Sequence, residues 1–146
     1  MDEETLRTFL FEEIGIVKDI ASRMGNNSFL IKGWAVTLIV ASLVIGGTFY
    51  QHLVAFFPWF VFWAYDAYFL RMERLYRKLY DWLIKNRLKT EEFLMEIERT
   101  SLDKRFGKEI PSMWRVMFSR TLVVFYGFLF VVIIVSVYLN FARAIC

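Results

Sequence analysis

Few residues of this chain belong to the types that carry acid, base or metal chemistry. The sequence has one His, His52, and one Cys, Cys146. A zinc site needs about four ligands of this kind, and a nucleophilic triad needs a matched histidine. The sequence also has no Gly-rich phosphate loop. We therefore predict a protein that is not an enzyme and holds no metal and no cofactor, with His52 as a solvated side chain in an exposed turn.

One acidic residue interrupts an otherwise apolar stretch. Asp66 lies near the end of residues 53–70, and Lys32 directly precedes the apolar residues 33–50. A charge at mid-membrane costs about 2.5 kcal/mol or more, which favours a partner or water. In an antiparallel hairpin the two side chains lie at a similar depth, so we predict an intramembrane ion pair between Lys32 and Asp66. This pair either fixes helix packing or belongs to an ion path.

A second group of residues is basic. Between residues 71 and 120, Lys and Arg number thirteen and Asp and Glu number eight. Such a cluster either fixes topology and contacts lipid headgroups, or lines a positive cavity when it is repeated around the axis of an oligomer. That cavity would suit a single-stranded nucleic acid rather than duplex DNA. The candidate ligand-binding residues are Lys104, Arg105, Lys108, Arg115 and Arg120.

The elements that must position these residues are membrane helices. The hydrophobic fraction is 58%, above the roughly 45–50% of soluble domains. A helix needs about 20 apolar residues to cross ~30 Å of hydrocarbon. Residues 33–50, 53–70 and 121–142 meet this requirement. Because only Gln51 and His52 separate the first two stretches, we predict a tight transmembrane hairpin.

Basic residues also predict the orientation, because those near the ends of spans stay in the cytoplasm. Residues 1–32 have four Lys or Arg, the hairpin turn has none, and only Arg143 follows the third span. We therefore predict a bacterial inner-membrane protein with a cytoplasmic N-terminus and a periplasmic C-terminus.

Polar side chains within the spans are few. Small and polar residues there either allow close helix packing or line a pore. The sequence has no ring of charges and no filter-like segment from which ion selectivity could be derived. The candidate pore-lining residues are Thr37, Ser136 and Asn140.

The segments outside the spans have helical periodicity. Apolar residues recur at three- or four-residue steps from Leu6 to Met24, with acidic residues such as Glu13 on other faces, and residues 25–27 predict a stop before a cap at Ser28. After the second span we expect helix to about Leu88, and a new helix from Thr90. The apolar stripes need a partner, for which copies of the same chain are the simplest source. The predicted fold is an all-α integral membrane protein, with a cytoplasmic amphipathic helix (1–28), a transmembrane helical hairpin (29–70), a basic cytoplasmic helical hairpin (71–118) and a third transmembrane helix (119–146).

Two segments carry a resemblance to a known group of proteins. Residues 27–34, NSFLIKGW, and residues 63–80, WAYDAYFLRMERLYRKLY, resemble a widespread group of small bacterial three-helix membrane proteins. That group is similar in size, helix order and net charge to membrane effectors of anti-phage defence, including the channel-forming effectors of Hailong systems. The resemblance implies a homo-oligomeric channel, with a tetramer favoured. It also implies that a single-stranded oligodeoxyadenylate, made by a nucleotidyltransferase, holds the channel shut from a basic cavity.

Two classes of function follow from these patterns. The first is a gated homo-oligomeric channel that acts as the effector of a bacterial anti-phage defence system, under the control of a nucleic-acid or nucleotide ligand. The alternative is a non-conducting membrane anchor or adaptor that recruits a protein partner through its cytoplasmic helices. A pore depolarises cells on overexpression, whereas an anchor does not. A transporter is disfavoured because no span is broken at its midpoint and no inverted repeat is visible.

Overall fold

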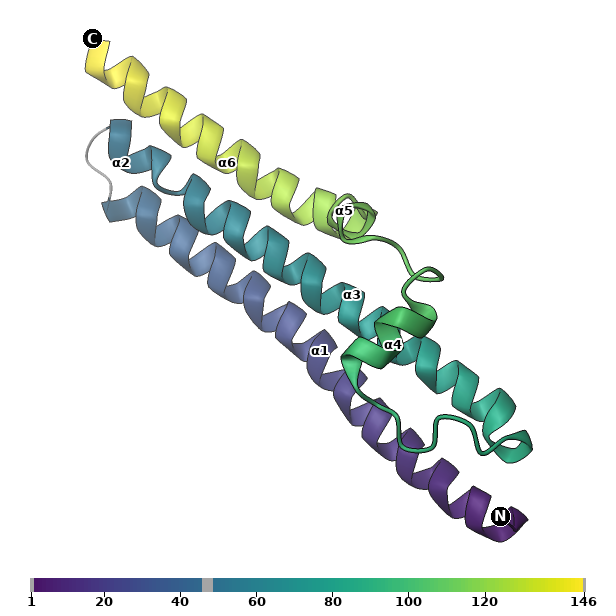
Figure 1. The fold of residues 1–146 in the computed structure, drawn as a ribbon. Coiled ribbons are helices and arrows are strands. Elements are labelled where there is room, and N and C mark those ends of the chain that lie inside the picture. Colours follow the sequence, from purple (N-terminus) through teal and green to yellow (C-terminus); the bar gives the residue numbers. More distant parts are fainter. Residues whose placement is uncertain (1, 46–48, 146) are drawn as a thin grey trace. The chain divides into compact units, whose positions relative to one another are not determined.

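The chain is all-helical over the residues that the structure describes. The computed structural model describes residues 2–45 and 49–145, so Cys146 lies outside the described residues. In this part of the chain there is no strand, as predicted. The helices are α1 (Glu3–Ile45), α2 (Phe49–Leu53), α3 (Phe56–Asn86), the 3₁₀ helix η1 (Arg87–Lys89), α4 (Arg99–Phe106), α5 (Met113–Met117) and α6 (Arg120–Ile145) (Figure 1).

The chain divides into two compact units. Unit 1 consists of Met1–Asn26 and Phe69–Ser112, and unit 2 of Asn27–Tyr68 and Met113–Cys146. Helices α1 and α3, with 43 and 31 residues, are long enough that each contributes to both units. Each unit therefore packs a different part of these two helices.

Helix α1 continues through residues 25–27, where the sequence predicted a stop. A glycine in a helix interior costs about 1 kcal/mol relative to alanine. Gly25 nevertheless lies against α3, because a Cβ built on it would be 3.5 Å from the Glu73 carboxylate. Ser28, the predicted cap, is buried within the helix instead. The predicted break is wrong because tertiary packing on both sides outweighs the local propensity.

In unit 2, the later part of α1 and the whole of α6 run antiparallel to the first part of α3 (Figure 1). Contacts along the chain fix this direction: the Trp63 indole donates to the Met117 carbonyl at 3.1 Å, while His52 contacts Asn140 at the other end of α6. The indole of Trp59 donates to the Tyr126 carbonyl at 2.8 Å between these points. Small and aliphatic side chains fill the centre of the unit: Ala35, Ile39, Ala55, Ala67, Leu122, Leu129 and Ile133 are buried.

The two-residue turn predicted at Gln51 and His52 is wrong. Both residues lie in α2, which contacts α6, and α1 already ends at Ile45. The next helix, α3, begins at Phe56, so that Pro58 falls in its first turn, where its missing N–H leaves no helical hydrogen bond unmade. Residues 53–70, predicted as one apolar run, are therefore interrupted by a boundary between α2 and α3.

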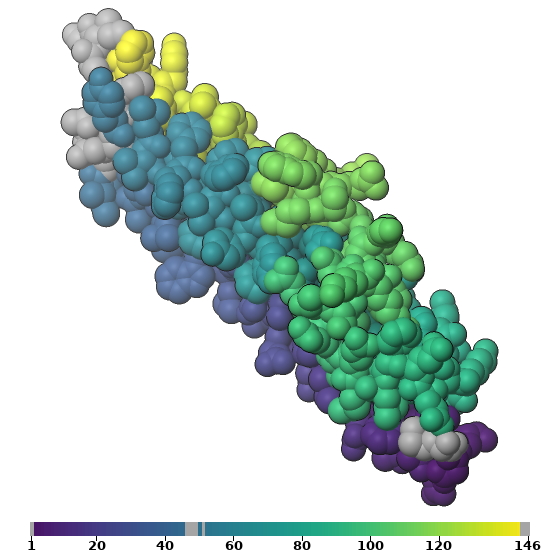
Figure 2. All heavy atoms as spheres, viewed as in Figure 1, coloured from purple at the N-terminus to yellow at the C-terminus, as the bar shows by residue number. Residues whose placement is uncertain are grey.

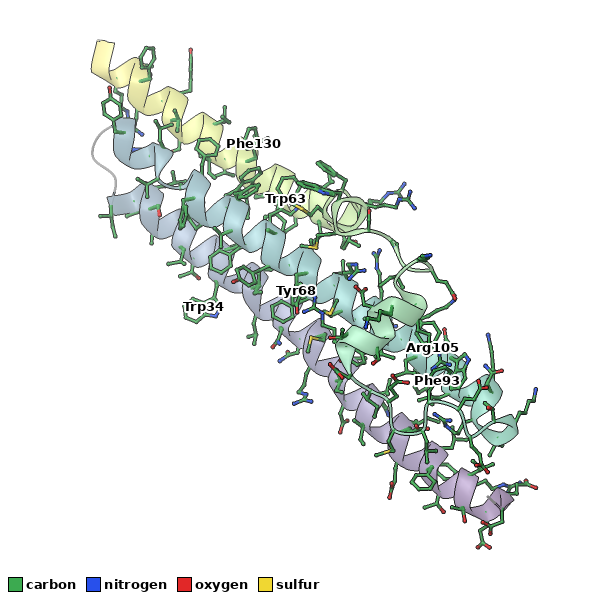
Figure 3. All side chains as sticks on the ribbon, in the orientation of Figure 1. Trp34, Trp63, Tyr68, Phe93, Arg105 and Phe130 are labelled. Carbon is green, nitrogen blue, oxygen red and sulfur yellow. The ribbon has the colours of Figure 1, made fainter. Side chains whose placement is uncertain are left out.

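The exterior of unit 2 is apolar. Large hydrophobic side chains such as Val44, Val124 and Phe128 are more than two-thirds exposed, and Trp34 points away from the helices (Figure 3). Two helices in the described residues, Glu3–Ile45 and Arg120–Arg143, are long and apolar enough to cross a membrane. In the most apolar 18-residue stretch of each helix, only 17% and 22% of the residues are buried inside the chain, whereas the core helix of a soluble protein is mostly buried.

In unit 1 the first part of α1 lies against the later part of α3, and α4 also contacts α3. Helix α3 ends at Asn86 and η1 at Lys89, close to the predicted end at Leu88. The helix predicted from Thr90 is wrong, because residues 90–98 form a non-helical segment and α4 begins only at Arg99. Side chains of residues 90–98 and of α4, coloured green in Figure 2, lie at the surface of unit 1. Its core contains Leu6, Val17, Leu75, Leu79, Leu83, Leu102 and Phe106.

Candidate functional site

Unit 2 contains a buried polar cluster centred on Asp66, whose side chain is 0% exposed. The structure brings the two predicted partners together, with Lys32 Nζ 2.6 Å from Asp66 Oδ2. The Ser28 hydroxyl donates to the other carboxylate oxygen, and the Tyr126 hydroxyl lies 3.2 Å from Oδ2. One side chain from α3 thus binds partners on both α1 and α6. A carboxylate with three donors is well satisfied, which matches the role of fixing helix packing.

Ser28 and Tyr126 were not among the predicted site residues. The signal for Ser28 is its spacing: it precedes Lys32 by four residues, so both side chains project from the same face of α1. Lys32 Nζ lies 2.9 Å from the Ser28 hydroxyl. Tyr126 gave a weaker signal, namely a phenol in an apolar helix that needs a hydrogen-bond partner when it is buried. Its partner comes from a helix 60 residues away in sequence, which helical periodicity does not reveal.

The prediction that His52 is a solvated side chain is wrong. Its side chain is 2% exposed, and its Nε2 lies 2.9 Å from the amide nitrogen of Asn140. The same amide donates to the Ser136 carbonyl at 2.9 Å. His52 is buried because α2 is a helix docked on α6 rather than an exposed turn. It forms a second polar contact inside unit 2, near the end opposite to Met117.

The three candidate pore-lining residues do not form one polar row. Thr37 is exposed on α1, and its hydroxyl donates to the Gly33 carbonyl of its own helix at 3.0 Å. Ser136 and Asn140 lie one turn apart on α6, where both are half-buried. The contacts of Asn140 with α2 make it a packing residue in a single chain.

The five candidate ligand-binding residues are shared between the units. Lys104, Arg105 and Lys108 belong to unit 1, whereas Arg115 and Arg120 belong to unit 2. All except Arg105 are exposed. Each unit by itself therefore holds only part of the predicted basic cluster.

Arg105 lies between aromatic rings. Its guanidinium carbon is 3.9 Å from the ring centres of both Trp82 and Phe93 and 4.8 Å from that of Phe106 (Figure 3). Burial lowers the pKa of this guanidinium, which stays charged because the ordinary value exceeds about 12. Stacking covers the faces of the group, while its N–H donors point outward in its plane. Phe106 is itself buried, so it does not offer a ring to a nucleic-acid base.

A pocket of about 390 Å³ lies beside this stacked arginine. Its lining combines two of the predicted basic residues with a hydroxyl, a carboxyl and a half-exposed ring. An anionic ligand with a planar group finds both cations and an aromatic surface there. The lining residues are Phe93, Glu96, Ser101, Leu102, Lys104 and Arg105.

A second buried ion pair, which the sequence did not predict, lies in unit 1. Glu13 and Arg87 are each 1% exposed, and two hydrogen bonds of 2.5 and 2.8 Å join them. The prediction that Glu13 lies on a polar face of its helix is wrong. Its spacing from Leu10 and Val17, three before and four after, puts it on the apolar face, and this was the available signal.

The same ion pair holds the segment that follows η1. Arg87 donates to the carbonyl oxygens of Glu92 at 2.7 Å and Phe93 at 3.0 Å. Glu13 Oε1 accepts the Met95 N–H at 2.7 Å. These contacts supply the backbone partners that a helix would otherwise supply, which explains why the predicted helix is absent.

Several other basic side chains of unit 1 are neutralised by acidic neighbours. Arg71 lies 2.7 Å from Asp103, and Lys78 lies 2.8 Å from Glu109. The hydrogen bond to the Glu109 carboxylate raises the pKa of Lys78. These cations are therefore less available to an anionic ligand than the exposed Lys104 and Lys108. Among the described residues, no group of three or more His, Cys, Asp or Glu side chains is placed to hold a metal ion.

Comparison with known proteins gave no match: no family profile, no curated protein and no solved structure is significantly similar to this chain.

Proposed function

We propose that unit 2 is embedded in a bilayer as three helices: the later part of α1, the first part of α3, and α6. The support is the apolar exterior of the unit together with two helices long enough to span a membrane. Helix α3 is rich in Trp and Tyr, which lower its hydropathy, yet it is hydrogen-bonded to both of the others. The backbone polar groups of the three segments are hydrogen-bonded within helices, as lipid requires.

In this arrangement the N-terminus is in the cytoplasm of a bacterial cell and the C-terminus is in the periplasm, across the inner membrane. The distribution of Lys and Arg supports this orientation. Unit 1 then lies on the cytoplasmic side with its exposed cations Lys104 and Lys108.

The lone cysteine gives a direct test of the orientation. We expect Cys146 to react with a membrane-impermeant maleimide in intact spheroplasts. In the matched control Glu4→Cys in a Cys146→Ser background, an exposed N-terminal position should react only in inverted vesicles. Labelling of Cys146 exclusively in inverted vesicles would show that the proposed orientation is reversed.

The function that we propose is a gated homo-oligomeric channel, which acts as a non-enzymatic effector of bacterial anti-phage defence. The observation that carries it is the continuity of α1 and α3, each of which belongs to unit 2 and also to unit 1. The 390 Å³ pocket of unit 1 is lined by residues 93–105, and Arg105 in its lining stacks on Trp82 of α3, so a ligand bound there acts through Arg105 on a helix that also belongs to unit 2. The proposed ligand is an anionic oligonucleotide, such as a single-stranded oligodeoxyadenylate from a nucleotidyltransferase, held by Lys104 and Arg105.

Reconstitution tests this function. In liposomes, the purified chain is expected to release entrapped ions, to form oligomers on cross-linking, and to leak less when single-stranded oligodeoxyadenylate is added. Lys104→Glu should weaken that inhibition about threefold or more, because one phosphate contact becomes repulsive. The matched control is Lys85→Glu, an exposed lysine outside the pocket lining. A monomeric chain that never conducts contradicts the channel.

One observation favours a second candidate, the non-conducting anchor or adaptor. The charged pair in unit 2, Lys32 and Asp66, is satisfied inside one chain, and Asn140 also bonds within that chain. A membrane unit closed in this way needs no aqueous path. A folded oligomer without leakage, together with capture of a specific protein by unit 1, would support the anchor instead.

A further inference from the structure

The non-helical segment 90–98 of unit 1 has the sequence of a helix. Thr90 is a preferred N-cap residue, and Glu91 and Glu92 would suit the positive end of a helix dipole. The rest of the segment consists mainly of Leu, Met, Glu, Phe and Ile without Gly or Pro, and it leads directly into α4. Local preference thus favours one helix from Thr90 through α4, whereas the structure has an open segment.

Two residues of this segment have a backbone conformation that their side chains disfavour. Phe93 has φ 57° and Met95 has φ 55°. In this left-handed region a bulky side chain crowds the backbone, and glycine is the usual occupant. Such conformations persist only where surrounding contacts hold them. The segment therefore has a strained backbone, and its conformation also differs from the helix that its residues favour.

A single ion pair, Glu13–Arg87, hydrogen-bonds the segment to α1 and η1. Arg87 binds carbonyl oxygens on one side of the bend, and Glu13 binds the Met95 N–H on the other. Packing adds the contacts of the Phe93 ring with Arg105 and Trp82, whereas the Met95 side chain is 43% exposed. The hydrogen bonds of this buried ion pair therefore oppose two effects that disfavour the bent form: the backbone strain at Phe93 and Met95, and the helix propensity of residues 90–98.

We infer that residues 90–98, here called the strap, have two conformations. The Glu13–Arg87 pair holds the bent form seen in the structure. When this pair is broken, the strap becomes a helix continuous with α4. Phe93 and Glu96 of the strap also line the pocket beside Arg105. A ligand that draws Arg105 away from Phe93 therefore favours the helical form. As a regulator of ligand binding the strap rests on the proposed function, but as a conformational device it does not.

The first test breaks the Glu13–Arg87 pair in the full chain in detergent micelles. Glu13→Gln keeps the shape of the side chain and removes its charge. We expect the ratio of bent to helical strap to fall about tenfold or more, the loss expected for a charge-assisted hydrogen bond. Far-ultraviolet circular dichroism should then show added helix. Spin labels at Glu12→Cys and Glu96→Cys, in a Cys146→Ser background, should report a changed distance.

The second test acts on strain without touching a charge. Combined with Glu13→Gln, Met95→Gly should restore the bent form, because glycine accepts the left-handed conformation. The matched control is Leu94→Gly, where φ is not positive and glycine disfavours only the helix. We expect Met95→Gly to restore the bent form about fivefold more than Leu94→Gly does.

Two results would overturn the strap: a Glu13→Gln chain with the helix content and spin-label distance of the wild type, or equal rescue by the two glycines. If Glu13→Gln fails to fold, the single glycine variants decide. Met95→Gly should then raise the unfolding midpoint, and Leu94→Gly should lower it. The opposite result would show that the backbone at Met95 is not strained. None of these readouts depends on conductance, so failure of the channel and failure of the strap are distinguishable.

Discussion

Replacement of Asp66 by leucine is expected to destabilise the folded chain by about 3–5 kcal/mol. The substitution leaves the Lys32 ammonium without its carboxylate and removes an acceptor of the Ser28 and Tyr126 hydroxyls, of which Tyr126 keeps the Phe62 carbonyl. In a bilayer or micelle an uncompensated charge costs more than the pair contributes, which makes the single variant worse than a fully apolar site. Unfolding by a denaturing detergent, followed by tryptophan fluorescence, measures the loss.

The double variant Lys32→Met with Asp66→Leu should recover most of that stability, because both charges are then absent. Exchange of the two charges, with Asp at 32 and Lys at 66, should recover part of it. Tyr65→Leu is the matched control, since its side chain is 56% exposed on the same helix, and it should change stability by no more than about 0.5 kcal/mol. If Asp66→Leu is as mild as this control, the cluster does not fix the helices.

The double variant also separates the two roles considered for the Asp66 pair. A packing role requires only that the site be neutral and filled, so a folded Lys32→Met, Asp66→Leu chain should leak ions like the wild type. An ion path requires the carboxylate itself, so the same folded chain should lose conductance. The hydrogen bonds that surround Asp66 in a single chain favour the first result.

The parts of the fold that sequence could predict depend on strong local patterns. The all-helical class and the helix through Leu88 follow from periodicity and from a long stretch without Gly or Pro. The partners Lys32 and Asp66 came together because a charge in an apolar stretch needs a counter-charge at equal depth. Helix boundaries failed where distant contacts decide them, as at Gly25, which packs beside Glu73, and in α2, which packs on α6.

The parts of the candidate sites that sequence missed depend on residues far apart in the chain. Arg87 and Glu13 are 74 positions apart, and only the folded unit shows that they are joined. Residues 90–98 show most clearly how tertiary contacts can override local preference. Their sequence favours a helix, but hydrogen bonds to Glu13 and Arg87 impose a bent form. Basic residues looked alike in sequence, yet Arg105 is stacked, Lys78 is paired and Lys104 is exposed.

Arg87→Met should be the most damaging single change in unit 1, with an expected loss of about 3–5 kcal/mol. Methionine keeps the unbranched apolar stem of the side chain, without the guanidinium group, and removes every N–H donor. The Glu13 carboxylate then stays buried without its counter-charge, and the carbonyl oxygens of Glu92 and Phe93 lose their donors. Thermal or denaturant unfolding of the purified chain, followed by circular dichroism, measures the change.

Arg77→Met is the matched control for this prediction, because it also breaks an Arg–Glu pair. Arg77 lies 2.6 Å from Glu73, but its side chain is 71% exposed, so water replaces the lost contact at a cost of about 0–1 kcal/mol. Equal losses in the two variants would mean that Arg87 is solvated in the native protein. A second substitution, Glu13→Leu on top of Arg87→Met, should recover the part of the loss that comes from the unpaired carboxylate. The remainder is the contribution of the hydrogen bonds that keep residues 90–98 out of a helix, which links the stability of unit 1 to the state of the strap.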